Sequence, residues 1–265
     1  MDAPPAQPQS LEDIRREIDR IDSAILKLVG ERLAMVDRVR AFKNGSGIAD
    51  ATPIRPAREA VILRRLIETA AGGVPAELCF TLWRALISAA TQRQAPVRVH
   101  GSTSLFASAS LHLLIREYFG QASLVPHPDE AAMLQAVAGN PADVGAVATD
   151  GPWITPFLDG LAGRAKVIGF LPFLTRKALP RVLILGQATP EPTGEDETLI
   201  VTDGALPGDF IPAPRWEMGA EGKRLTSVPG FLSDHDMPLV GLRHPNSRLA
   251  LTIIGRYPSP IEVRS

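Results

Sequence analysis

The N-terminal part of the chain carries a long helical repeat of apolar side chains. Between residues 14 and 42 they recur at alternating steps of four and three: Ile14, Ile18, Ile21, Ile25, Leu28, Met35, Val39 and Phe42. Ser10 opens the pattern with Asp13 three places later, and Asn44-Gly45-Ser46-Gly47 ends it. The pattern predicts one helix of roughly 33 residues, or about 50 Å. Two short helices cannot cover such a stripe, so the sequence predicts a second copy of the chain alongside it.

Two shorter helices are predicted next. Pro56 suits a first helical position, and the second helix runs to Gly72-Gly73. Pro75 opens a third helix, in which one row has a residue every four places: Leu78, Leu82, Leu86, Ala90 and Gln94. The segment 92–100, with a proline at position 96, is interpreted as the join to a second domain.

Beyond this join, short apolar runs alternate with helical segments, a pattern typical of an α/β domain. The predicted strands are Val144–Ala148, Val167–Phe170, Val182–Leu185 and Leu199–Val201. The predicted helices are Leu105–Phe119 and Glu130–Ala138. Residues 186–260 are too rich in loops for further elements to be placed. We therefore expect a multidomain chain with a disordered tail (1–9), a helical domain (10–95) and an α/β domain (100–265).

Composition narrows the function. A formal net charge of −1 argues against bulk attraction to nucleic acid or to an anionic membrane. The one cysteine, Cys79, cannot form an internal disulfide, and the N-terminus lacks the features of a signal peptide. No uncharged run reaches the roughly 18 to 20 apolar residues of a membrane span. These features predict a cytoplasmic protein.

Three cations lie along the first helix. Arg32 occupies a position of the apolar stripe, where a buried arginine needs a partner or an anion. Lys43 lies about 20° around the helix axis from Arg32 and about 16 Å along it, so both side chains share a face. Arg15 lies about 25 Å from Arg32 and about 100° around the axis. One helix cannot bring Arg15 to the same small molecule, whereas an antiparallel partner helix can.

The other two helices add Arg58, Glu59 and Gln94. Neither a Ser/His/Asp grouping, nor metal-ligand spacing, nor a phosphate-binding glycine loop is found in this half of the sequence. A site with several cations, one carboxylate and one amide suits a small dianion whose reaction needs no nucleophile. The spacing alone also fits structural roles, namely a solvated helix face for Arg15, an ion pair with the partner helix for Arg32, and a helix-dipole contact for Lys43.

The basic residues and their spacing resemble those of the all-helical chorismate mutases over residues 10–95. The resemblance is carried by Leu11-Glu12-Asp13-Ile14-Arg15-Arg16-Glu17-Ile18-Asp19-Arg20-Ile21-Asp22, Glu31-Arg32, Lys43 and Ile54-Arg55-Pro56-Ala57-Arg58-Glu59. It implies three helices per chain, interlocked in a homodimer with two sites, each of which converts chorismate to prephenate without a cofactor or a metal.

The resemblance also implies roles for individual residues. Arg15 reaches into the partner's site and holds one substrate carboxylate, while Arg32 holds the other. Lys43 and Gln94 bind the ether oxygen, which becomes negative in the transition state. Glu59 holds the substrate hydroxyl.

Arg58 supports the site as a further cation that binds substrate. Two positions depart from the family's pattern: Arg55 stands where an aspartate is common, and Ala90 stands where a serine is common, four places before Gln94. Arg55 is grouped here with the substrate-binding residues. The loss of the serine hydroxyl is expected to weaken substrate affinity.

The second half of the chain resembles a prephenate dehydratase domain more distantly, which implies a fold like that of periplasmic binding proteins. The segments that carry this resemblance are Gly101-Ser102-Thr103-Ser104-Leu105-Phe106, Phe119-Gly120, Asp143-Val144-Gly145-Ala146-Val147 and Arg181-Val182-Leu183-Ile184-Leu185-Gly186. The family's catalytic Thr-Arg-Phe aligns with Pro180-Arg181-Val182, and its Glu-Asn pair with Thr149-Asp150, so we expect that dehydration chemistry is lost.

The leading hypothesis is a chorismate mutase with a divergent second domain. An isochorismate–pyruvate lyase, which shares the helical fold, is one rival. A catalytically idle regulator that senses an aromatic metabolite is another, and a bifunctional mutase–dehydratase is the third.

Overall fold

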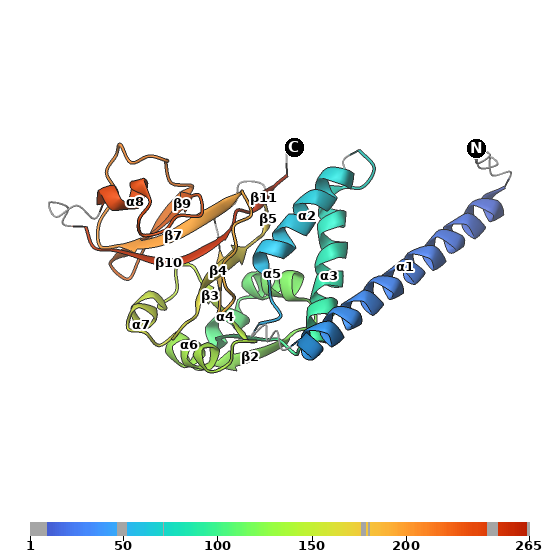
Figure 1. Cartoon of the computed structure of the whole chain (residues 1–265), viewed down its shortest axis with the longest axis horizontal. Helices are drawn as coiled ribbons and strands as arrows, with labels where there is room; N and C mark the ends of the chain where they lie inside the picture. The colour runs from blue at the N-terminus through green and yellow to red at the C-terminus, as the bar shows by residue number, and fades with distance from the viewer. Residues whose placement is uncertain are drawn as a thin grey trace. The chain divides into compact units, whose positions relative to one another are not determined.

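The computed structural model describes residues 10–46, 52–70, 72–175, 179, 181–242 and 249–263 (Figure 1). By their contacts the residues divide into one unit of residues 1–49 and another of residues 50–265. The predicted tail at residues 1–9 lies outside the described residues. No helix in the described part of the chain is both long and apolar enough to span a membrane.

The first unit contains helix α1 (Leu11–Ser46), which confirms the predicted long helix. Ser10 begins it, since its hydroxyl oxygen accepts a hydrogen bond from the backbone N–H of Asp13 at 3.2 Å. With 36 residues the helix is about 54 Å long. All eight side chains of the predicted apolar stripe are 42–70% exposed within one chain.

The second unit begins with an α-helical hairpin of α2 (Pro56–Ala70) and α3 (Ala76–Gln94), as predicted. The hairpin buries Leu63 of α2 together with Phe80 and Ile87 of α3. The predicted row on α3 starts with side chains that remain exposed, since Leu78 is 50% and Leu82 48% exposed. Helix α3 therefore has two apolar faces, and the chain covers only one of them fully.

The rest of the second unit is an α/β domain, which confirms the predicted fold class. Its strands are β1 (Arg98–Ser102), β2 (Ser123–His127), β3 (Val144–Ala148), β4 (Lys166–Leu171), β5 (Leu174–Thr175), β6 (Val182–Gly186), β7 (Asp196–Thr202), β8 (Trp216–Ala220), β9 (Lys223–Pro229), β10 (Leu251–Pro258) and β11 (Ile261–Glu262). Its helices are α4 (Thr103–Ala107), α5 (Ala109–Phe119), α6 (Glu130–Gly139), α7 (Ile154–Leu158) and α8 (Met237–Leu242). All four predicted strands and the predicted helix at 130–138 are confirmed.

The single helix predicted at 105–119 is wrong, because the chain breaks there into α4 and α5 at Ser108. The Ser108 backbone is extended, and its N–H bonds to the carbonyl of Leu105, which ends α4. Its own carbonyl accepts from the N–H of His112 and so begins α5. The apolar pattern continues through this break and therefore does not reveal it.

In the described residues, nine strands form one sheet in the order β2-β1-β3-β6-β4-β10-β7-β9-β8. The strands β2, β1 and β3 are parallel, β6 is antiparallel to β3, and β10 is antiparallel to β7. Successive side chains of β6 point to opposite faces. Val182 and Ile184 pack with residues of α2, α3 and α5, while Leu183 and Leu185 pack with residues of α6 and α7.

Helices α2 and α3 therefore share a hydrophobic core with the sheet. This shared core is why the contacts of a single chain divide at residue 49 and not at the predicted join near residues 95–100.

Candidate functional site

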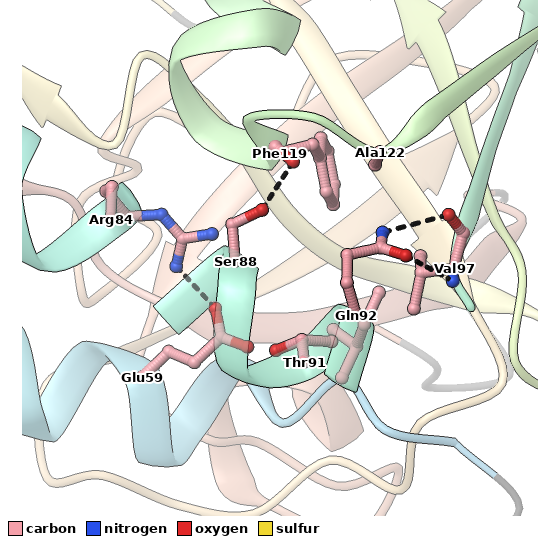
Figure 2. A pocket seen from close by; sticks show the side chains of 9 residues that line it. Glu59, Arg84, Ser88, Thr91, Gln92, Val97, Phe119 and Ala122 are labelled. Atoms are coloured by element: carbon pink, nitrogen blue, oxygen red, sulfur yellow. Dashed lines mark hydrogen bonds and ion pairs between the residues drawn. The ribbon is translucent and has the colours of Figure 1, made fainter. Parts of the chain in front are cut away.

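A small pocket lies where α2 and α3 meet the end of α5 (Figure 2). Its free volume of about 10 Å³ is room for one water-sized group. The residues that line it are Ile54, Glu59, Arg84, Ser88, Thr91, Gln92, Val97, Phe119 and Ala122. The pocket is therefore lined by both the helical hairpin and the α/β domain.

A buried ion pair connects α2 to α3 in this pocket. Nη1 of Arg84 lies 2.6 Å from a carboxylate oxygen of Glu59, and their side chains are 3% and 9% exposed. Burial would lower the pKa of Arg84, but its interactions with Tyr118 and Glu59 outweigh that effect and raise the pKa above its ordinary value. Arg84 therefore stays charged, and Glu59 has a permanent cationic partner.

Arg84 also binds the α/β domain. Its Nε and Nη2 donate to the backbone carbonyl of Tyr118 at 3.1 and 2.5 Å. The guanidinium carbon lies 3.7 Å from the centre of the Tyr118 ring, in a cation–π contact. Burial raises the pKa of the Tyr118 phenol, Arg84 opposes this rise, and the nearby Glu59 adds to it. Tyr118 of α5 therefore interacts with both Arg84 and Glu59.

Two further side chains of α3 contact the α/β domain. The hydroxyl of Ser88 donates to the carbonyl of Phe119 at 2.5 Å (Figure 2). Gly120 allows this approach, because a Cβ there would lie 2.9 Å from the Ser88 hydroxyl and its backbone φ is +57°. The amide of Gln92 donates to the carbonyl of Val97 at 3.0 Å and accepts from its N–H at 3.2 Å. Gln92 therefore joins the end of α3 to the residue that precedes β1.

The residues predicted on α2 and α3 occupy different surroundings. Glu59 lines the pocket, whereas Arg58 is exposed and Gln94 is half-buried, and neither lines it. Nη2 of Arg55 donates to both carboxylate oxygens of Glu191, at 2.8 and 3.0 Å. Glu191 thus engages one nitrogen of the Arg55 guanidinium, and the predicted substrate contact of Arg55 stays a prediction.

The three predicted cations of α1 belong to the unit of residues 1–49. Arg15 is exposed and lies 3.8 Å from Glu12. Arg32 is half-buried, and this partial burial lowers the pKa of its guanidinium. The backbone of Lys43 lies in α1, and its side chain lies outside the described residues.

Sequence reasoning missed Arg84, Ser88 and Gln92. Their spacing of four residues places them on one face of α3 and was a signal that could have revealed them. Ser88 and Gln92 also repeat the serine-to-glutamine spacing that appeared to be lost at Ala90. Gln92 and Gln94 are about 200° apart around the helix axis, so they point to nearly opposite sides of α3.

A second buried polar cluster joins β1, β2 and β3. Asp143 accepts hydrogen bonds from Arg98 at 2.6 Å and Asn140 at 3.0 Å, and lies 3.1 Å from Nε2 of His100. Nδ1 of His100 is 2.8 Å from Nε2 of His127. Burial would raise the pKa of Asp143, but Arg98 and His100 lower it, and burial lowers the pKa of His100. Within the described part of the chain, no cluster of His, Cys, Asp and Glu side chains is placed to hold a metal ion.

The helical region of the chain is similar to a known protein family. Residues 14–95 match chorismate mutase type II. The bifunctional chorismate mutase/prephenate dehydratase of Aquifex aeolicus (strain VF5) is 30% identical over 115 residues. That alignment covers 42% of this chain and 31% of the relative. Residues 14–95 are therefore similar to chorismate mutases, and the chain spans about a third of the length of this relative.

Two solved structures are similar to a larger part of the chain. GqqA, described as a novel type of quorum quenching acylase, shares 19% identity with a TM-score of 0.42, covering 62% of this chain and 96% of its own. Prephenate dehydratase from Streptococcus mutans shares 14% identity with a TM-score of 0.37, covering 62% of this chain and 98% of its own. At these scores neither likeness is evidence for what the α/β domain does.

Proposed function

We propose that this protein rearranges chorismate to prephenate in aromatic amino-acid biosynthesis. The observation that carries the proposal is the match of residues 14–95 to chorismate mutase type II. Arg15, Arg32 and Lys43 on α1, and Glu59 and Gln94 on the hairpin, supply the groups that the reaction needs.

The chemistry explains why these groups suffice. The rearrangement is unimolecular: a carbon–oxygen bond breaks while a carbon–carbon bond forms. Arg15 and Arg32 would hold the two carboxylates and so favour the compact conformer. Lys43 and Gln94 would donate hydrogen bonds to the ether oxygen as it becomes negative. Each such donor typically contributes about 2.7–4 kcal/mol to the stability of the transition state.

The site requires a second copy of the chain. The apolar stripe of α1, from Ile14 to Phe42, is about 42 Å long, and its side chains are exposed in a single copy. The exposed side chains of Leu78 and Leu82 on α3 offer a second apolar surface. A homodimer in which each α1 lies along the partner's helices would cover both surfaces and bring Arg15 to the partner's site.

The two glutamines near the end of α3 have different surroundings. Gln94 points to nearly the opposite side of α3 from Gln92, whose amide is already bonded to Val97. The pocket beside Glu59 has room for one water-sized group, which is the size of a hydroxyl and far smaller than the ring. Only the hydroxyl of chorismate would enter it.

Variants of Gln94 and Gln92 test the proposed function. Gln94→Ala should reduce kcat/KM for chorismate by about 100- to 1,000-fold, because a donor to the ether oxygen is lost. Gln92→Ala is the matched control and should keep kcat within about threefold while lowering thermal stability, because an unmade hydrogen bond is its main cost. If Gln92→Ala abolished turnover and Gln94→Ala did not, the site would lie on the opposite face of α3. If neither variant changed turnover, neither glutamine would bind the ether oxygen.

A further inference from the structure

The inference concerns how Glu59 is held, and it rests on the proposed mutase function. A carboxylate that accepts a hydrogen bond from a substrate hydroxyl must keep one orientation. Glu59 extends from α2, and its side chain is only 9% exposed. The two groups that surround it come from α3 and from the α/β domain.

Arg84 fixes Glu59 from α3. Its Nη1 bonds to one carboxylate oxygen at 2.6 Å, while Nε and Nη2 bond to the carbonyl of Tyr118. Because the guanidinium is planar, these bonds at two of its edges fix the direction from which it meets Glu59. Lysine would keep the charge but would lose this orientation.

Tyr118 fixes Arg84 from the α/β domain. Its carbonyl accepts two hydrogen bonds from Arg84, and its ring lies against the guanidinium. Beside it, Ser88 donates to the carbonyl of Phe119 (Figure 2). Two successive carbonyls at the end of α5 are therefore bonded to α3. The position of α5 therefore determines the position of Arg84.

We propose that Arg84 and Tyr118 are positioning residues for Glu59, so that the end of α5 sets how well the mutase site recognises the substrate hydroxyl. The α/β domain thereby becomes part of the mutase without touching the reacting atoms. Without the contacts from Arg84 and Tyr118, the carboxylate of Glu59 stays in place but is badly oriented.

The variant Arg84→Lys of the full-length protein tests whether Arg84 positions Glu59. This change should reduce kcat/KM for chorismate by about 10- to 100-fold, chiefly through KM, because an oriented hydrogen bond to a charged group is weakened. Arg65→Lys, at an exposed position on α2, is the matched control and should leave kcat/KM within about twofold. Circular dichroism establishes that each variant is folded.

A double-mutant cycle separates positioning from a purely structural role. If Arg84 acts through Glu59, the double variant Glu59→Gln/Arg84→Lys should be no worse than Glu59→Gln alone, within about threefold. The double variant Glu59→Gln/Arg84→Met removes both charges and provides a second comparison if Arg84→Lys does not fold. If the losses of kcat/KM from Glu59→Gln and from Arg84→Lys multiplied in the folded double variant, the inference would be overturned.

A substrate without the hydroxyl gives an independent measure. With a chorismate analogue that lacks the ring hydroxyl, Arg84→Lys and wild type should react within about threefold of one another, because Glu59 then has no partner. An equally large loss on the analogue would refute positioning and leave the mutase assignment intact. If wild-type protein turned over neither compound, the proposed function and the inference would both be overturned.

Discussion

The cost of breaking the Glu59–Arg84 pair can be worked out from its burial. Arg84→Met removes a cation that is 3% exposed and leaves the carboxylate of Glu59, 9% exposed, without its partner. The carbonyl of Tyr118 loses two hydrogen-bond donors at the same time. Breaking one side of a buried pair typically costs 3–5 kcal/mol, so we expect the free energy of unfolding to fall by about that amount.

Removing both charges should cost much less. In Glu59→Gln/Arg84→Met no buried charge is left without a partner, and replacement of a whole buried pair is often close to neutral. We expect the double variant to unfold within about 2 kcal/mol of wild type, and therefore to be more stable than Arg84→Met alone. Arg65→Met, at an exposed position, is the control and should change the free energy by at most about 0.5 kcal/mol.

Urea unfolding followed by circular dichroism and tryptophan fluorescence measures these differences. Trp83 reports on α3, while Trp153 and Trp216 are buried in the α/β domain. Because Arg84 bonds to Tyr118, helix α3 and the α/β domain should unfold together in Arg84→Met. The midpoints measured by circular dichroism and by tryptophan fluorescence should therefore shift by the same amount. A loss below about 1 kcal/mol in Arg84→Met would show that the pair contributes little and would refute the reasoning from burial. A double variant less stable than Arg84→Met would refute it equally.

Three further predictions concern the sheet, its polar cluster and the dimer. Gly255→Ala should lower the free energy of unfolding by about 3 kcal/mol or more in urea titrations, because a Cβ there would collide with the backbone of β4; a neutral effect would contradict the strand pairing. Burial lowers the pKa of His100 below its ordinary 6.5, so the unfolded chain takes up a proton first and the melting temperature should fall as pH drops below about 6.5. His100→Asn should reduce this dependence of the melting temperature on pH, whereas the control His235→Asn, at an exposed position, should not. If the melting temperatures of both variants fell equally steeply with pH, His100 would be excluded as the source of the dependence. Mixed Arg15→Ala and Lys43→Ala chains, each inactive alone, should recover at most about a quarter of wild-type activity, because only one site of each mixed dimer is intact; no recovery despite proven chain exchange would exclude a shared site.

The sequence predicted the helices of the N-terminal region well, because each has a strong signal in the chain itself. The apolar repeat of α1 continues for eight positions, Pro56 begins α2, and Gly72-Gly73 lie between α2 and α3, followed by Pro75 at the N-terminus of α3. The predicted strands of the α/β domain were short apolar runs buried on both faces, such as β6. The break at Ser108 was missed because it depends on backbone hydrogen bonds that leave the apolar pattern unchanged.

The surroundings of the site residues were harder to predict. Glu59 was expected to face a substrate, but its partner Arg84 and the contact to Tyr118 depend on how the hairpin packs against α5. That packing joins residues 34 positions apart, beyond the reach of a helical repeat. The ion pair between Arg55 and Glu191 spans 136 positions and was equally invisible in the sequence.

The central claim is that this protein makes prephenate, and identifying products by NMR tests it most directly. Purified full-length protein would be incubated at neutral pH with chorismate and, separately, with isochorismate. We expect prephenate from chorismate, with no phenylpyruvate beyond the uncatalysed background. Salicylate and pyruvate from isochorismate, without turnover of chorismate, would show a lyase instead. Turnover of neither substrate would contradict the claim and favour a regulator without catalytic activity.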